Sequence, residues 1–207
     1  MRHGYGAPVV TGFWRNRDVG FGYALVLLVI AIAVFAQPSG VAGQAVLNSS
    51  TNLHNLRTEP LSVLFLSAFV LDSPWDLWVL PLLIGVYGCA QRWLGRAATV
   101  LVAASGHVFS TMFVALLVNA GIANHQLSRR LANEPDVGVS YGLAALLGVL
   151  AFRLRPPVRR TVALGSTALL LAVMAVSQTF TDLGHLVAWS IGLTMGFVGS
   201  RLAEAQE

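Results

Sequence analysis

The chain contains six apolar stretches, each about as long as a membrane span and longer than the buried stripe of a soluble helix. About 20 apolar residues cross the ~30 Å hydrocarbon core at ~1.5 Å per helical residue. Of the 207 residues, 56% are hydrophobic and only 11% are charged. The stretches cover residues 21–36, 75–91, 97–118, 137–152, 161–176 and 183–198. We therefore expect an all-α membrane protein, a single bundle of six transmembrane helices without a soluble domain.

The positions of the basic residues predict how this bundle is oriented. All thirteen are arginines, and only Arg57, Arg129 and Arg130 fall in one set of connecting loops. The others lie before the first stretch, after the last, or in the opposite loops: Arg2, Arg15, Arg17, Arg92, Arg96, Arg153, Arg155, Arg159, Arg160 and Arg201. The positive-inside rule then places both termini in the cytoplasm. We expect a cytoplasmic segment over residues 1–20, a membrane domain over 21–201 and a cytoplasmic tail over 202–207.

Composition also excludes several classes of function. The net charge of +4 and the pI near 10 reflect topology, because the arginines form no run with interleaved aromatic residues that would indicate nucleic-acid binding. The lone Cys89 excludes an internal disulfide and a cysteine-based zinc site. Neither a metal nor an organic cofactor is indicated.

Four segments bear on the number and the limits of the spans. Val34-Phe35-Ala36 resembles a signal-peptide cleavage site, but removing the first stretch would leave five crossings and contradict the arginine placement. Residues 38–59 are rich in Gly, Ser, Asn and Thr, which predicts a long external loop. The apolar run over 61–71 is too short to span and suits a surface or re-entrant element. Pro156-Pro157 is expected to separate the fourth and fifth helices.

Two polar residues near the starts of membrane stretches are the strongest candidates for chemistry. With the orientation above, the second, fourth and sixth stretches enter from the outside, and Asp76, Ser140 and His185 share the first turn of each. Serine is a weak nucleophile until a base takes its proton, and histidine is the usual base. Alone, Ser140 would more often bond to its own backbone and His185 would bridge helices. Their common depth favours a catalytic pair.

Small residues predict which helices touch. In the fourth stretch Ser140, Ala144 and Gly148 recur every four residues, and Gly138 and Gly142 lie on either side of the serine. In the sixth stretch the residues with this spacing are Gly184, Ala188, Gly192, Gly196 and Ser200. Such spacing lets membrane helices approach through backbone contact. We expect these two faces to pack together, which would bring His185 close to the Ser140 hydroxyl.

Six short motifs follow one another along residues 61–199: Leu66-Ser67-Ala68-Phe69, Trp75-Asp76-Leu77-Trp78, Gly85-Val86-Tyr87-Gly88, Arg92-Trp93-Leu94-Gly95, Gly138-Val139-Ser140, and His185 followed by Ala188 and Gly192. In these motifs the chain resembles rhomboid intramembrane serine proteases. The resemblance implies a six-helix rhomboid-like bundle in a bacterial plasma membrane, with its active site facing the exterior. It further implies a cofactor-free endopeptidase that cleaves transmembrane segments of other proteins, with Ser140 as nucleophile and His185 as base.

The chain departs from the rhomboid pattern around the oxyanion. The histidine and asparagine that the family carries on its second helix are replaced by Asp76 and Leu80, the glutamate after that helix by Arg92, and the glycine after the nucleophile by Tyr141. Asp76 would donate a hydrogen bond only if protonated. His107 is either a replacement donor toward the oxyanion or a buried interhelical hydrogen-bonding group.

Supporting roles around the oxyanion therefore fall to Gly138, Tyr141, Asp76 and His107, whereas Asp136 and Asp182 are expected to cap helix N-termini. Two rivals remain. The first is a catalytically inactive rhomboid-like scaffold or chaperone that binds transmembrane helices. The second is a small transporter or channel, which would need ionisable residues at mid-depth, where His107 is the clear candidate.

Overall fold

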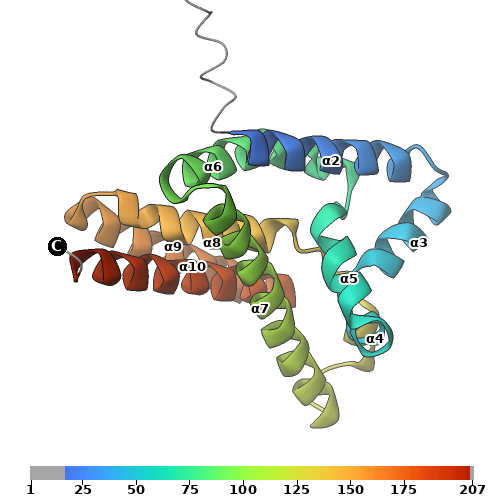
Figure 1. Cartoon of the computed structure of the whole chain (residues 1–207). Coiled ribbons are helices and arrows are strands. Elements are labelled where there is room, and N and C mark those ends of the chain that lie inside the picture. Colours follow the sequence, from blue (N-terminus) through green and yellow to red (C-terminus); the bar gives the residue numbers. More distant parts are fainter. Residues whose placement is uncertain (1–16, 206–207) are drawn as a thin grey trace, which may run out of the picture.

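The computed structural model describes residues 17–205, and most of them are helical. The α-helices are α2 (Asp18–Phe35), α3 (Ser39–Ser49), α4 (Leu53–Thr58), α5 (Pro60–Leu66), α6 (Val79–Leu94), α7 (Arg96–Ala123), α8 (Val139–Leu150), α9 (Pro156–Ser177) and α10 (Phe180–Glu204). Short 3₁₀ turns are η1 (Ser67–Phe69), η2 (Pro74–Trp78), η3 (Arg129–Asn133) and η4 (Ala151–Arg153). In Figure 1, α2 runs along α6, α9 lies beside α10, and α3–α5 gather at the end away from the C-terminus.

Within the described residues 17–205, five helical segments are long and apolar enough to cross a membrane: Asp18–Phe35, Pro74–Leu94, Arg96–Ala123, Pro156–Ser177 and Phe180–Glu204. The sixth predicted span forms α8, whose 12 residues extend about 18 Å. This short helix contacts α6, α7 and α10. Because those longer helices surround it, α8 does not have to match the thickness of the bilayer. The expectation of an all-helical membrane bundle is confirmed.

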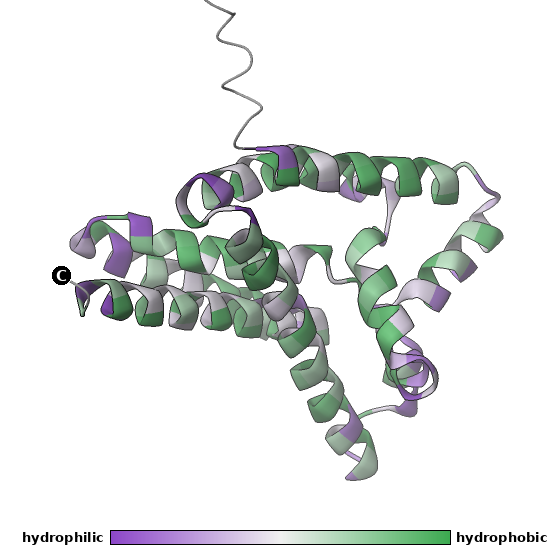
Figure 2. Ribbon diagram, in the orientation of Figure 1, coloured by the Kyte–Doolittle hydropathy of each residue, from purple (hydrophilic) through white to green (hydrophobic). Residues whose placement is uncertain are grey.

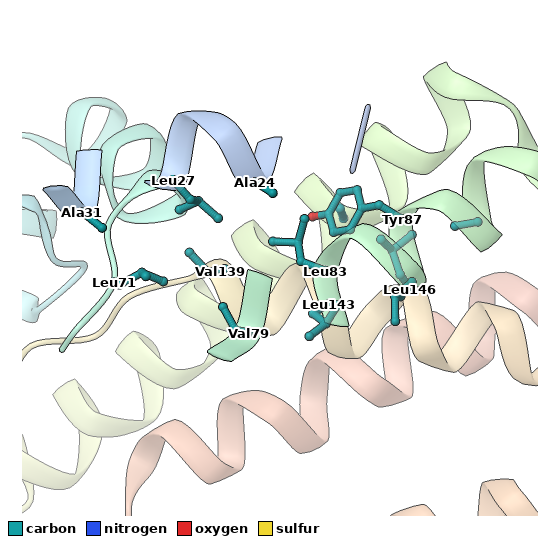
Figure 3. Packing of buried hydrophobic residues seen from close by; sticks show 13 residues of the cluster. Ala24, Leu27, Ala31, Leu71, Val79, Leu83, Tyr87, Val139, Leu143 and Leu146 are labelled. Atoms are coloured by element: carbon teal, nitrogen blue, oxygen red, sulfur yellow. The ribbon is translucent and has the colours of Figure 1, made fainter. Parts of the chain in front are cut away.

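A core of apolar side chains joins α2, α6 and α8. Leu27, Leu83 and Leu146 are completely buried within it, and Tyr87 is nearly so (Figure 3). Gly20 of α2 lies so close to α6 that an added Cβ would be 3.1 Å from the carbonyl oxygen of Ile84. The first helix is therefore an integral part of the packed bundle.

The outer surfaces of the long helices are apolar, as Figure 2 shows. Large exposed hydrophobic side chains include Ile32 on α2, Leu116 on α7 and Leu164 on α9. A surface of this kind is stable only in contact with lipid or a partner. Trp75 and Trp78 of η2 are also exposed, and amphipathic indole rings are typical of the membrane–water interface.

The loop predicted over residues 38–59 is wrong, because the structure forms α3 and α4 there. Its polar residues satisfy helix ends instead of preventing helices. The Asn52 side chain accepts a hydrogen bond from the Asn55 N–H (2.9 Å), which caps α4. The Asn55 side chain donates to the carbonyl oxygens of Leu47 (2.8 Å) and Ser50 (2.9 Å), which ties the end of α3 to α4.

Other boundaries agree in part with the sequence-based expectation. The break between α8–η4 and α9 falls directly before Pro156 and Pro157, as expected, and the two prolines are the first residues of α9, because the first helical positions need no N–H donor. Asp76 lies in the η2 turn, where the N–H of Ser73 donates to its carboxylate (2.9 Å). The short run over 61–71 forms α5 and η1 at the surface. The predicted cytoplasmic residues Arg2 and Arg15 lie outside the described residues.

Candidate functional site

Ser140 is the second residue of α8, and the loop before it fixes the start of that helix. The N-cap residue is Gly138, whose N–H donates to the carbonyl oxygen of Ser67 (3.0 Å) in η1. A Cβ at position 138 would lie 1.7 Å from Nδ1 of His107 on α7. Glycine is therefore required here because the backbone passes directly against a buried histidine ring.

His185 lies in the second turn of α10 and faces Ser140. Its Nε2 is 2.8 Å from the Ser140 Oγ, within hydrogen-bonding distance, and both side chains are half-buried. A serine hydroxyl that donates to a neutral imidazole at this distance can transfer its proton to the ring as it attacks a carbonyl carbon. The structure thus brings together the two residues that the sequence placed at one depth.

Contacts between backbones hold α8 and α10 together. A Cβ added to Gly192 would lie 2.0 Å from the carbonyl oxygen of Ala145, and one added to Gly148 would lie 2.6 Å from that of Trp189. Ala188 is fully buried on the same face of α10. Gly196 lies against the ring of Phe152, where an added Cβ would be 2.4 Å from the ring. The α10 face is thus the predicted one.

The predicted α8 face is rotated from its expected position. Ala145, rather than Ala144, is the fully buried residue between helices. It also packs on α7, because a Cβ at Gly106 would lie 2.3 Å from that of Ala145. Gly142 faces the carbonyl oxygen of Ala103 and the Tyr87 hydroxyl, away from α10. The face of α8 is shared between two neighbouring helices.

A cavity of about 400 Å³ lies over the Ser140–His185 pair, between the N-terminal ends of η2–α6, α8 and α10. Its lining is Leu71, Asp72, Asp76, Trp78, Val79, Pro135, Asp136, Val137, Val139, Ser140, Leu143, Thr181 and His185. Three of these residues are aspartates and none is an arginine. Burial and the charge of Asp76 raise the pKa of Asp72, which lies in the loop before η2.

Asp136 is not the exposed helix cap that the sequence suggested. It is 5% exposed, and its Oδ1 accepts a hydrogen bond from the hydroxyl of Tyr141 (2.8 Å). Thr51, from the segment before α4, donates through its hydroxyl to the Asp136 backbone oxygen (3.1 Å) and to Oδ2 (3.4 Å). Burial raises the pKa of this loop carboxyl to about 6. Asp182 does lie at the N-terminal end of α10, with its N–H bonded to Thr179 (3.3 Å).

Tyr141, which stands where the rhomboid pattern has glycine, is completely buried. Its ring meets the His185 ring edge to face, with centroids 5.3 Å apart. A Cβ at Gly184 would lie 2.3 Å from the same phenol ring. The absence of a side chain at Gly184 therefore makes the space that Tyr141 occupies.

His107 does not point toward Ser140. Its Nε2 is 2.8 Å from the carbonyl oxygen of Leu64 and 3.2 Å from the Oγ of Ser67. A carbonyl oxygen only accepts, so Nε2 carries the ring proton and Nδ1 is left as an acceptor against Gly138. A neutral His107 therefore has no free N–H for an oxyanion. Its contacts match the alternative of a buried hydrogen bond, here between α7 and the α5–η1 segment.

Backbone donors are available at the start of α8. Within residues 17–205, the N–H groups of Val139 and Ser140 donate to no backbone carbonyl, as is usual in the first turn of a helix. These groups lie at the positive end of the helix dipole. Negative charge that develops beside Ser140 would be stabilised there.

Sequence reasoning missed the contributions of Thr51, Asp72 and Gly106 to this region. Gly106 follows Ala103 and precedes Ser110 on one face of the third apolar stretch, a small-residue pattern that would have identified it. Thr51 lies 85 positions from Asp136, and no local pattern joins the two.

A family model of rhomboid-like proteins matches residues 14–201 of the chain. No curated protein and no solved structure matches the chain. The family match covers nearly the whole chain, including every described membrane helix up to residue 201, and agrees with the all-helical bundle. The chain belongs to the rhomboid-like protein family.

Proposed function

We propose that this protein is an intramembrane serine endopeptidase in which Ser140 is the nucleophile and His185 the general base. The observation that carries the proposal is the 2.8 Å contact between Ser140 Oγ and His185 Nε2 inside a cavity of about 400 Å³. A serine hydrogen-bonded to its own helix would lack such a partner. The substrate class, transmembrane segments of other proteins, follows from the bilayer setting and the rhomboid-like family.

The proposed reaction uses only groups of this chain and the substrate. Ser140 Oγ attacks the scissile carbonyl carbon while His185 Nε2 takes its proton, and the resulting oxyanion is stabilised by the N–H of Ser140 at the start of α8. His185 then gives the proton to the leaving amine as the C–N bond breaks, and the acyl group stays on Ser140 as an ester. Water, deprotonated by His185, hydrolyses the ester and restores the pair.

We further infer the orientation from the arginine distribution. The N-terminal ends of η2–α6, α8 and α10 face the exterior of the plasma membrane, and both termini are cytoplasmic. The membrane domain covers residues 21–201, flanked by the short segments 1–20 and 202–207. Substrates would then be cut near the external end of their membrane span.

An inactive helix-binding scaffold or chaperone is the second candidate function. It is favoured by the three aspartates in the cavity, because ionised carboxylates only accept hydrogen bonds. Asp76 accepts a bond from the Ser73 N–H, and His107 bonds to Leu64, so neither supplies the neutral donor that active rhomboids carry. Losing one oxyanion donor typically costs ~10²–10³ in rate.

A serine-directed fluorophosphonate separates the two functions. The protease proposal predicts that the purified protein is labelled at Ser140, and that Ser140→Ala and His185→Ala each abolish labelling and cleavage of a reconstituted transmembrane substrate. The double variant should be no worse than either single one, because the two side chains act as a unit. Ser190→Ala is the matched control, since that hydroxyl bonds to the Leu186 carbonyl on its own helix (2.8 Å).

Labelling that persists in Ser140→Ala would reject the protease proposal. A scaffold gives a different pattern, in which the parent is not labelled and binds a transmembrane helix as well as Ser140→Ala does. Bulky substitutions on the helix faces would then abolish that binding.

A further inference from the structure

Tyr141 lies between the proposed base and a buried carboxylate. The Tyr141 ring packs against the His185 ring with an interplanar angle of 76°. The Tyr141 hydroxyl donates a hydrogen bond to Asp136 Oδ1 at 2.8 Å. The three side chains therefore form a continuous chain of contacts from a loop carboxylate, through a phenol, to the imidazole beside Ser140.

Two members of this chain, Asp136 and Tyr141, are held by residues outside it. The backbone oxygen of Asp136 accepts two hydrogen bonds from Thr51, one from its N–H (2.9 Å) and one from its hydroxyl (3.1 Å). Tyr141 is completely buried and packs against Gly184. Because Tyr141 is completely buried, its ring forms a closely packed wall against which the His185 ring rests.

We propose that Asp136 is a positioning residue that acts on His185 through Tyr141 and favours the imidazolium that forms during catalysis. This inference rests on the proposed protease function and adds the third group to its Ser–His pair. Tyr141 then replaces the expected glycine as a working part of the site.

The physical basis is the one that governs other activated serines. A general base works best when a third group fixes its ring and stabilises the positive charge it gains. Here the carboxylate does not bond to the imidazole directly. Hydrogen bonding to an anion polarises the phenol and makes its ring a better neighbour for a cation. The Tyr141 proton stays on its oxygen throughout, and only the Ser140 proton moves to His185.

The charge state of Asp136 should therefore control the rate. Its pKa is raised to about 6 by burial, so the carboxyl loses its charge as the pH falls toward mildly acidic values. The ionisable groups facing it are Asp72, Asp76 and His185 in the large cavity, Glu134 in the small cavity beside Thr51, and Tyr141. No arginine lines either cavity.

The test is the rate at which fluorophosphonate labels Ser140 in Asp136→Asn, from about pH 5 to about pH 8. Asparagine keeps the size of the side chain and an oxygen that accepts from Tyr141. We expect the rate at the upper pH to fall by up to about 100-fold, the cost of a misplaced or unsupported reacting group. The acidic limb of the profile should change from a two-proton to a one-proton dependence. Glu59→Gln, which removes an exposed acid that lines neither cavity, should keep the parental profile.

Two further measurements distinguish positioning from simple stability. The melting temperature of Asp136→Asn in detergent should exceed that of the parent at about pH 8 and approach it near pH 5, because an amide carries no charge to bury. Tyr141→Phe keeps the ring but loses the hydroxyl, so it should slow labelling as much as Asp136→Asn, and the double variant should be no slower.

Two outcomes would overturn the inference. If Asp136→Asn is labelled at the parental rate with the parental pH profile while Ser140→Ala is not labelled, the positioning role is wrong and the protease proposal stands. If the parent itself is never labelled at Ser140, the protease proposal fails and the positioning role fails with it.

Discussion

Helices α8 and α9 follow one another in the chain and are both apolar, yet they are packed in opposite ways. Eight of the 12 residues of α8 are buried, whereas none of the 22 residues of α9 is. α8 touches α6, α7 and α10, and α9 packs along α10. Apolar content by itself therefore does not decide which membrane helix becomes the core.

The difference comes from small residues and their partners. Gly148 and Ala145 of α8 meet the backbone of α10, and Gly106 of α7 meets Ala145 from the other side. On α9, Gly165 has nothing within 4 Å of an added Cβ. A side-chain hydrogen bond from Trp189 Nε1–H to the hydroxyl of Thr167 (3.0 Å) joins α10 to α9.

This contrast shows which helices set the positions of the candidate catalytic side chains. Ser140 and His185 lie on the two helices that are in backbone contact, so their separation is set by rigid elements. α9 forms an outer wall in which no residue is buried. Substitutions should therefore be costly at the α8–α10 contact and tolerated along α9.

The largest expected effect is that of Gly192→Leu. A side chain at this position would start 2.0 Å from the Ala145 carbonyl oxygen and force α8 and α10 apart. We expect a loss of about 3 kcal/mol or more in the free energy of unfolding, together with loss of Ser140 labelling. The thermal melting curve in detergent measures the first effect.

Gly165→Leu on α9 and Gly199→Leu near the end of α10 are the matched controls, because both sites are open. Both variants should melt within a few degrees of the parent. Equal melting of Gly192→Leu and Gly165→Leu would show that the contrast between the two helices does not govern stability.

A smaller effect is expected for Gly138→Ala. Its φ of −93° is accessible to alanine, so the cost arises only from the methyl group, which would meet the His107 ring. We expect a loss of about 2 kcal/mol and slower labelling of Ser140, because the start of α8 must shift. Gly85→Ala in α6, where the added methyl meets open space, should leave both properties unchanged or slightly improved. A parental labelling rate in Gly138→Ala would contradict a tightly fitted α8 start.

The smallest effect is expected at the α9–α10 contact. Thr167→Val removes the acceptor of the Trp189 N–H and should cost about 0.6 kcal/mol, the usual value for such bonds between membrane helices. Thr161→Val is the control on the same helix, since that hydroxyl bonds to Pro157 in its own turn. If Thr167→Val destabilised the protein as much as Gly192→Leu does, α9 would be as firmly packed as α8.

Much of the fold follows from local patterns in the sequence. The number of membrane stretches and their order depend on apolar length, which each segment carries by itself. The backbone contact at Gly148 and Gly192 follows from small residues spaced four apart. Gly138, Ser140 and His185 lie near the starts of their helices. An estimate of depth to within one helical turn is sufficient there to predict that Ser140 and His185 are neighbours.

Other features depend on groups that only the folded chain brings together. The rotation of α8 is set by α7 and α10 at once, so Ala145 rather than Ala144 is buried, a difference of one residue that no small-residue count resolves. Residues 38–59 are helical because asparagine side chains cap and join α3 and α4.

The sequence by itself determined a helical membrane bundle with a serine and a histidine at one depth, because hydrophobic length and helical periodicity are properties of single segments. The likeness to rhomboids came from short motifs in the same sequence. Only the tertiary structure decided the surroundings of that pair. Asp136 becomes a buried partner of Tyr141 because Thr51 covers it, and His107 is turned toward Leu64 by the α5–η1 segment. Burial and hydrogen-bond direction depend on neighbours distant in the chain, and these fix the chemistry available to a side chain.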